Sequence, residues 1–171
     1  VKGGFVRGDV AVVKNKSNSD TIDRLREYIR SAKITRKIQY AFVHCTANQN
    51  GASVESIKKY WKEKLGWKNV GYHIILTDDN FEVLANFDTI SNGASGYNSN
   101  GVHISYVGGI DRYGKAKDTR TDFQKKAINV FLEEITSKIK GVKVLGHNEV
   151  ANKACPSFSV KEEYPKYWTG K

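Results

Sequence analysis

From residue 38 onward, short segments rich in β-forming residues alternate with segments whose apolar residues recur every three or four positions. Strands are expected at 38–46, 71–77, 81–85, 102–107 and 142–146, and longer helices at 54–65 and from Thr121 to Gly141. This alternation is typical of a sheet covered by helices, and 171 residues suffice for one such domain. The pattern therefore predicts a single α/β domain over 38–171, with a central mixed β-sheet flanked by helices.

Capping residues support the predicted helices. Ser53 stands directly before one helical segment, and Thr121 with Gln124 forms the capping-box pattern before another. Ser159 with Glu162 repeats that pattern and predicts a short helix near the C-terminus.

One pair of strands has a clear hairpin signal. Asp78-Asp79-Asn80 separates two β-rich segments, which favours an antiparallel pair. Strand alternation would place Tyr72, Ile74 and Leu76 on one face and His73 on the other.

Residues 1–37 are expected to form a basic extension with one helix. They hold ten Lys and Arg against four Asp and Glu, and so carry most of the net charge of +10. Asp20 is a plausible N-cap for a helix over 21–33, which has an apolar stripe. We expect the stripe to dock on the main domain, a partner or wall surface being the alternative. The basic surface suits a polyanion such as nucleic acid, anionic cell wall or acidic lipid, or is simply well solvated.

The sequence also bears on location and redox chemistry. No apolar run approaches the ~20 residues of a membrane helix, and no secretory signal is visible at the start. Two cysteines, Cys45 and Cys155, allow at most one disulfide, so a disulfide framework is excluded.

Three potential metal ligands follow strands of the predicted sheet. His44 lies near the end of the strand at 38–46, and His147 and Cys155 flank a loop after the strand at 142–146. Their spacing fits no zinc-finger pattern, but the ends of neighbouring strands converge, and three such ligands with an open fourth position suit a catalytic zinc. A Cys-His protease using Cys45 or Cys155 is the chief mechanistic rival.

Other residues of these segments have structural interpretations. His73 could be a buried core histidine, and His103 could serve either packing or the rim of a Gly-, Ser- and Asn-rich loop at 88–101. Cys45 would point to the opposite face from His44, where a buried thiol behaves as a small hydrophobe.

Four blocks of the sequence carry a resemblance to a known family. They are FVHCTA at 42–47, GYHIILT at 71–77, GYN at 96–98 with VGGID at 107–111, and HNEVANKACPSF at 147–158. The chain resembles, over about residues 38–168, the zinc amidase lysozymes of T-odd bacteriophages. These are type 2 N-acetylmuramoyl-L-alanine amidases, which share a fold with peptidoglycan recognition proteins.

The resemblance implies a site and an activity. It implies one zinc ion bound by His44, His147 and Cys155 at the floor of a groove, with Tyr72 and Lys153 assisting catalysis. The implied reaction is hydrolysis of the amide between the lactyl group of N-acetylmuramic acid and L-alanine of the stem peptide. The expected protein is a monomeric endolysin that meets muropeptide at the bacterial cell wall, with no specific nucleic-acid partner. Residues 1–37 would add contact with the anionic envelope.

The chain departs from the family pattern at three places near the expected groove. Asn152 stands where relatives often have proline, the loop at 91–96 lacks a histidine common in them, and His103 occupies a position that is usually small. Glu149 is either a partner that holds His147 or an ordinary loop carboxylate. A non-catalytic peptidoglycan-binding module of the same fold is the alternative function, although loss of the cysteine ligand typically marks that branch and Cys155 is present.

Overall fold

Five strands form one sheet in the order β3-β2-β4-β1-β5, in a computed structural model that describes residues 17–171. The strands are β1 (Tyr40–Cys45), β2 (Ile74–Leu76), β3 (Phe81–Val83), β4 (Gly101–Tyr106) and β5 (Lys143–Gly146). β1 lies parallel to β4 and β5, β2 lies parallel to β4, and β3 pairs antiparallel with β2 at the edge. The expected mixed sheet is confirmed.

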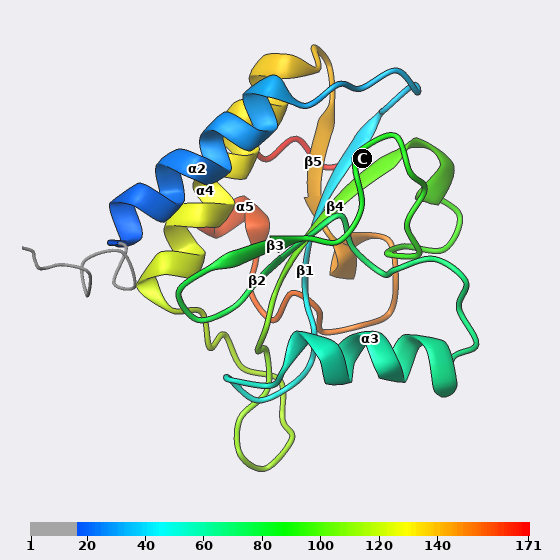
Figure 1. The fold of residues 1–171 in the computed structure, drawn as a ribbon, viewed down its shortest axis with the longest axis vertical. Coiled ribbons are helices and arrows are strands. Elements are labelled where there is room, and N and C mark those ends of the chain that lie inside the picture. Colours follow the sequence, from blue (N-terminus) through cyan, green and yellow to red (C-terminus); the bar gives the residue numbers. More distant parts are fainter. Residues whose placement is uncertain (1–16) are drawn as a thin grey trace, which may run out of the picture.

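The helices are distributed over both faces of this sheet (Figure 1). They are α2 (Asn18–Ser31), α3 (Val54–Glu63), α4 (Asp122–Lys138) and α5 (Val160–Glu163), with short 3-10 turns η1 (Asn98–Asn100) and η2 (His147–Glu149). Apolar residues of α2, α4 and α5 share the largest core cluster with the sheet, whereas α3 packs in a second cluster around Ile75. None of the described helices is long and apolar enough to cross a membrane.

Alternate residues of β1 face these two sides. Ala41 and Val43 belong to the core beneath α2 and α4, while Phe42 belongs to a separate cluster on the opposite face. His44 shares the face of Phe42, with ring centroids 6.1 Å apart. The predicted alternation along this strand is confirmed, and it sends the His44 imidazole away from the helical core.

Helix α2 differs slightly from its predicted bounds. It begins at Asn18, because the Ser17 hydroxyl caps it by accepting a hydrogen bond from the Asp20 backbone N–H, and it ends at Ser31. The expected N-cap at Asp20 is therefore wrong: this residue lies in the first turn. The predicted stripe does dock on the domain, since Leu25 and Ile29 are fully buried. Residues 1–16 of the basic extension lie outside the described residues.

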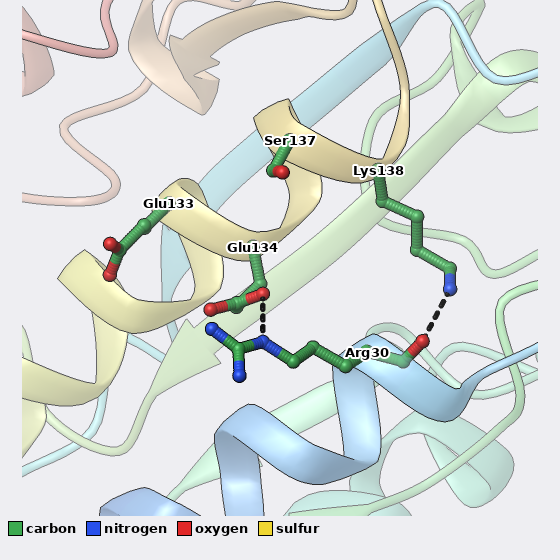
Figure 2. A pocket seen from close by; sticks show the side chains of 5 residues that line it. All are labelled: Arg30, Glu133, Glu134, Ser137 and Lys138. Carbon is green, nitrogen blue, oxygen red and sulfur yellow. Dashed lines mark hydrogen bonds and ion pairs between the residues drawn. The ribbon is translucent and has the colours of Figure 1, made fainter.

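Ion pairs fasten α2 to α4 beside this apolar contact. Figure 2 shows the Arg30 Nε of α2 donating to the Glu134 carboxylate of α4 at 2.9 Å, and the Lys138 amine donating to the Arg30 carbonyl at 2.8 Å. Arg26 also donates to Glu133 and Glu134. Burial opposes ionisation of Glu134, but its two arginine partners hold the pKa of that carboxyl below its usual range. Two cations of the extension are thus paired with acidic residues of α4.

The remaining helix predictions agree with the structure at their starts. Ser53, Thr121 and Ser159 each cap the expected helix, and Thr121 with Gln124 forms a full capping box. Helix α3 ends at Glu63, two residues before its predicted end.

The hairpin is confirmed, but one of its predicted faces is not. Ile74 and Leu76 pack in the core under α2 and α4, whereas Tyr72 packs with the α3 cluster on the opposite side. Strand β2 begins only at Ile74, so alternation does not extend back to Tyr72. The expectation that Tyr72 shares a face with Ile74 is therefore wrong.

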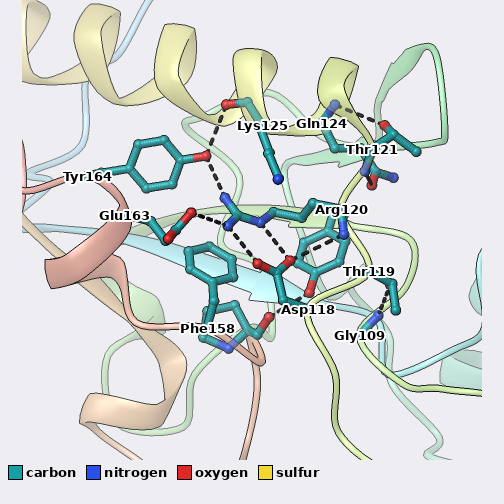
Figure 3. Close-up of polar contacts among 12 residues, drawn as sticks. Gly109, Asp118, Thr119, Arg120, Thr121, Gln124, Lys125, Phe158, Glu163 and Tyr164 are labelled. Carbon is teal, nitrogen blue, oxygen red and sulfur yellow. Dashed lines mark hydrogen bonds and ion pairs between the residues drawn. The ribbon is translucent and has the colours of Figure 1, made fainter.

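A buried arginine organises the chain around α5. The Arg120 guanidinium donates to Asp118, to Glu163 and to the Tyr164 hydroxyl, and lies 3.6 Å from the Phe158 ring centroid (Figure 3). These contacts join the loop before α4 to α5 and to the segment that precedes it. They fix the stretch of chain that carries Cys155.

Candidate metal centre and groove

Three of the predicted site residues meet at one end of the sheet. His44 lies near the carboxyl end of β1, and His147 begins η2 directly after β5. Since β1 and β5 are parallel neighbours, with Val43 opposite Gly146, their carboxyl ends bring the two imidazoles together. The ring centroids lie 4.8 Å apart. The potential ligand atoms of His44, His147 and Cys155 all lie within 4.8 Å of one another.

The third ligand is held by backbone contacts. The Cys155 Sγ lies 3.8 Å from the His44 Nδ1 and accepts a hydrogen bond of 3.2 Å from the Cys45 backbone N–H. The next residue is anchored as well, because the Tyr106 hydroxyl donates to the Pro156 carbonyl at 2.7 Å. The thiol is therefore positioned by the strand that carries His44 and by β4.

The surroundings keep the two candidate histidine ligands in the protonation state that binds a metal. Burial, followed by the neighbouring His103, holds the pKa of His44 well below its ordinary value. Burial and the nearby Lys153 lower the pKa of His147 to about 4. Both imidazoles are thus neutral at neutral pH, as a metal ligand must be. The adjacent Cys45 thiol and burial raise the pKa of the Cys155 thiol, so a cation would have to displace its proton.

Tyr72 and Lys153 lie beside the cluster. The Tyr72 ring is 5.0 Å from the His44 ring, and its hydroxyl donates to the Cys45 carbonyl at 3.2 Å. Burial raises the pKa of Tyr72, so the phenol stays protonated at neutral pH. Lys153 is exposed and makes no ion pair with any residue of 17–171. All five predicted site residues are therefore close together.

Two adjoining cavities, which we call the groove, open over this cluster. One of about 770 Å³ runs between the cluster and the wall formed by α3 and Trp67, and the other, of about 300 Å³, continues to the loop at 92–95. They share four lining residues, which are Trp67, Tyr72, His147 and Lys153. The loop that was expected to form a rim does line the groove.

The rim loop is tied to the end of the basic extension. The Arg36 guanidinium donates to the carbonyls of Phe87, Ser99 and Gly101 at 2.7–3.0 Å. The Asp88 carboxylate accepts hydrogen bonds from the backbone N–H groups of Thr35 and Arg36. Residues 35–36 therefore hold both ends of the rim loop at 88–101 by hydrogen bonds.

The sequence left the roles of His73 and Glu149 open, and the structure shows what each of them contacts. His73 is a buried structural residue: its Nδ1 accepts from the His103 backbone N–H and its Nε2 donates to the Thr89 carbonyl. Glu149 accepts from the Gly146 backbone N–H and the Trp168 indole N–H, and so does not hold the His147 ring. Its interpretation as a loop carboxylate is the correct one.

The Cys45 thiol lies in the apolar core on the opposite face from His44. It is 3% exposed, and among the described residues its Sγ contacts the Ser157 hydroxyl at 3.8 Å rather than an imidazole that could act as its base. The protease alternative based on Cys45 therefore fails.

Sequence reasoning missed two features of the groove. Trp67, which lines both cavities, was not singled out, although its position between Gly66 and Gly71 marks an aromatic residue in a tight turn. The direct contact between His103 and His44 was also missed. Strand alternation could have indicated it, because Phe42 pairs with His103 across β1 and β4 on the same face.

Comparison with known proteins agrees with this geometry. The sequence profile of the N-acetylmuramoyl-L-alanine amidase family (Amidase_2) matches residues 34–158. The endolysin of Escherichia phage T7 is 39% identical over 129 residues, covering 73% of this chain and 84% of that protein. The endolysin of Klebsiella phage KP32 is 37% identical over 128 residues, with the same coverage.

Solved structures share the fold at lower sequence identity. The Ph2119 endolysin from Thermus scotoductus MAT2119 bacteriophage superposes with a TM-score of 0.64 at 19% identity, covering 82% of this chain and 91% of that one. The ectodomain complex of peptidoglycan recognition proteins LCa and LCx, bound to tracheal cytotoxin, gives a TM-score of 0.66 at 18% identity, covering 81% and 88%. The family expected from the four sequence blocks is thereby confirmed. The chain belongs to the N-acetylmuramoyl-L-alanine amidase family, and its function is that of a peptidoglycan-lysing amidase.

Proposed function

We propose that the protein binds one zinc ion through His44, His147 and Cys155 and hydrolyses the amide between the lactyl group of N-acetylmuramic acid and L-alanine of the stem peptide. The observation that carries the proposal is the convergence of the three candidate ligand atoms within 4.8 Å of one another, with His147 and Cys155 lining the groove. The phage endolysins among its relatives support a role in lysis at the bacterial cell wall.

The donor set fits zinc in kind and in spacing. Two imidazole nitrogens and one thiolate are typical catalytic zinc ligands, with a fourth position left open. Nitrogen and sulfur donors of a tetrahedral zinc lie about 3.3–3.7 Å apart, and the Cys155 Sγ already lies 3.8 Å from the His44 Nδ1. A bound zinc ion polarises a carbonyl oxygen and brings the pKa of a coordinated water down to about 7.

Tyr72 and Lys153 supply the groups that act on substrate. The protonated Tyr72 hydroxyl lies beside His44, where it can donate a hydrogen bond to the carbonyl oxygen on which negative charge develops. The Lys153 amine, at the junction of the two cavities, adds a positive charge near the same oxygen. Hydrolysis adds the oxygen of one water molecule to the lactyl carbonyl carbon and breaks the C–N bond, and a proton of that water goes to the L-alanine nitrogen, which leaves as an amine.

The groove walls provide for an extended substrate. Tyr60, Trp61 and Trp67 form an aromatic wall on one side of the cluster, and the loop at 92–95 forms the other end. Aromatic side chains bury sugar and aliphatic surface without strong directional demands, so the wall suits the glycan and peptide parts of a muropeptide.

The direct test measures zinc and lysis together. Purified protein should contain one zinc per chain by elemental analysis and should clear a turbid suspension of peptidoglycan. A chelator should abolish clearing, and added zinc should restore it. Active protein without zinc, or tight muropeptide binding by zinc-loaded protein without release of new amino termini, would contradict the proposal, the latter in favour of a binding module.

We also propose that the basic extension adds attachment to the anionic envelope. Lys33 and Lys37 are exposed, whereas Arg26 and Arg30 are engaged with α4. The double substitution Lys33→Glu with Lys37→Glu should weaken binding to whole sacculi severalfold at low salt and little at 0.5 M salt, because screening removes exposed charge interactions. Hydrolysis of a soluble muropeptide should be unchanged. Equal binding by both proteins at every salt concentration would contradict this attachment.

A further inference from the structure

One of the three ligand residues has a buried partner that the proposed reaction does not use. The His44 Nε2 lies 2.8 Å from the His103 Nδ1, and both side chains are fully buried. The other nitrogen of His44, Nδ1, is the one that faces the Cys155 Sγ. The His44 ring therefore lies between Cys155 on one side and His103 on the other.

A single hydrogen atom occupies the short contact between these two rings. If the His44 Nε2 carries it and donates to the His103 Nδ1, the His44 Nδ1 has a free lone pair directed toward the cluster. If the His103 Nδ1 donates instead, the proton of neutral His44 sits on Nδ1 and blocks that lone pair. Only the first arrangement allows His44 to bind a metal.

We propose that His103 is a positioning residue that accepts the Nε2 proton of His44 and so fixes the tautomer and ring orientation in which the His44 Nδ1 binds the metal. Metal-ligating histidines almost always donate their second N–H to a carboxylate, a carbonyl or water, and here a neutral imidazole takes that part. The proposal rests on the proposed zinc site and adds a residue that controls its affinity.

The His103 ring is held firmly enough for this role. It stacks between Phe42 and His73, with ring centroids 5.3 and 5.7 Å away and both interplanar angles at 8°. The His103 backbone N–H donates to the His73 Nδ1 at 3.0 Å. On the loop side, a Cβ added to Gly93 would overlap the His103 ring at its Nδ1. Gly93 therefore allows the rim loop to close over the ring.

Packing alone does not explain a histidine here. The His103 Nε2 is buried without a hydrogen-bond partner among residues 17–171. A buried polar atom without a partner destabilises a fold, and an aliphatic side chain of similar volume would avoid that cost. The one polar contact that the His103 ring makes within the described chain is the contact with His44.

Two substitutions separate positioning from packing. In His103→Asn, the amide oxygen can occupy the place of the Nδ1 and still accept from His44. In His103→Leu, the volume is similar but no acceptor remains. Val102→Ala serves as a control, because Val102 belongs to the same strand and faces the core on the other side.

The measurement is the zinc dissociation constant by competition with a chelator, together with the melting temperature of each zinc-free protein. We expect His103→Leu to bind zinc about 10- to 100-fold more weakly while its zinc-free form melts at or above the wild-type temperature. His103→Asn should stay within a few fold of wild-type affinity, and Val102→Ala should melt lower with unchanged affinity. Nitrogen-15 spectra of zinc-loaded protein should show the His44 proton on Nε2.

The outcomes distinguish this proposal from the one it rests on. A wild-type protein that fails to bind zinc would contradict the metal site itself. Wild-type zinc binding with equal affinity in His103→Leu would overturn the role of His103 alone. Equal losses of affinity in the Leu and Asn variants, or a loss in His103→Leu matched by zinc-free destabilisation, would assign the residue to packing and would also overturn it.

Discussion

The two faces of strand β1 differ in their surroundings: one packs in the apolar core and the other faces the groove. Residues of the two faces alternate along the strand. Ala41 and Val43 point into a core of apolar side chains from α2, α4 and the sheet. Phe42 and His44 point the other way, toward three buried histidines and the groove. The helical face needs volume and apolar surface, which many residues supply. The groove face needs particular atoms at particular places, and those atoms are costly to bury.

The difference extends to the way each face is held together. On the helical face, apolar burial stabilises the contact and the ion pairs of Arg26 and Arg30 with Glu134 fix the register of α2 on α4. On the groove face, hydrogen bonds from backbone groups orient individual side chains, as the Cys45 N–H does for Cys155. Substitutions on the two faces should therefore damage different properties of the protein.

The largest effect is expected for removal of the proposed thiolate ligand. Cys155→Ser should lose zinc and reduce peptidoglycan hydrolysis by at least about a thousandfold, because a serine hydroxyl is a far poorer zinc ligand than a thiolate. Metal analysis and turbidity clearance check both effects. Cys45→Ala is the matched control, since that thiol belongs to the apolar face, and it should keep zinc. If Cys45→Ala lost zinc while Cys155→Ser kept it, Cys45 rather than Cys155 would be the ligand.

On the helical face, Leu25→Ala should destabilise the fold without touching the chemistry. Leu25 is fully buried, and such a truncation typically lowers the free energy of unfolding by about 2–5 kcal/mol. Urea unfolding measures the change, and turnover per bound zinc should stay at the wild-type value. Glu27→Ala on the exposed side of α2 should shift stability by less than about 0.5 kcal/mol. A Leu25 variant of unchanged stability would show that α2 is dispensable to the core.

Tyr72→Phe and Lys153→Ala should lower turnover without destabilising the fold. Each should lower turnover by roughly ten- to a thousandfold, as for a lost donor to a developing negative charge. Zinc content and melting temperature should remain near wild type, because neither side chain is a ligand. Tyr113→Phe, at a tyrosine that is 71% exposed, provides a control for loss of a hydroxyl. Wild-type turnover in both site variants would leave catalysis to the metal alone.

The smallest predicted effect concerns pH and the groove face. Burial is the main cause that lowers the pKa of His73 to about 4, and Arg36 adds to it. The unfolded chain takes up a proton near pH 6.5 while the folded His73 stays neutral, so stability is full above pH 6.5 and is lost as pH falls toward 4. Between pH 7.5 and 4.5 this group should cost about 2–3 kcal/mol, measured by urea unfolding of zinc-free protein. In His73→Gln, unfolding should take up about one proton fewer over this pH range than in wild type. A pH dependence of stability identical to that of wild type would contradict the prediction.

Local signals predicted much of the secondary structure. Ser53, Thr121 and Ser159 cap helices where the sequence places them, since capping depends on a side chain and the N–H groups two or three residues away. The face of Tyr72 was wrong because alternation holds only inside a strand, and the pairing partner β4 decides where β2 begins. The start of α2 was wrong by three residues because Ser17 and Asp20 both suit a cap.

The sequence by itself determined the α/β class and predicted the proposed ligands and assisting residues, because the four blocks of residue types can be recognised whatever the exact packing. Only the tertiary structure decided that α2 completes the core, that Arg36 braces the rim loop and that the His103 Nδ1 lies 2.8 Å from His44. These contacts join residues far apart in the chain, and their geometry depends on how whole elements pack. A hydrogen bond changes with tenths of an ångström, whereas a sequence pattern specifies only which face a side chain occupies.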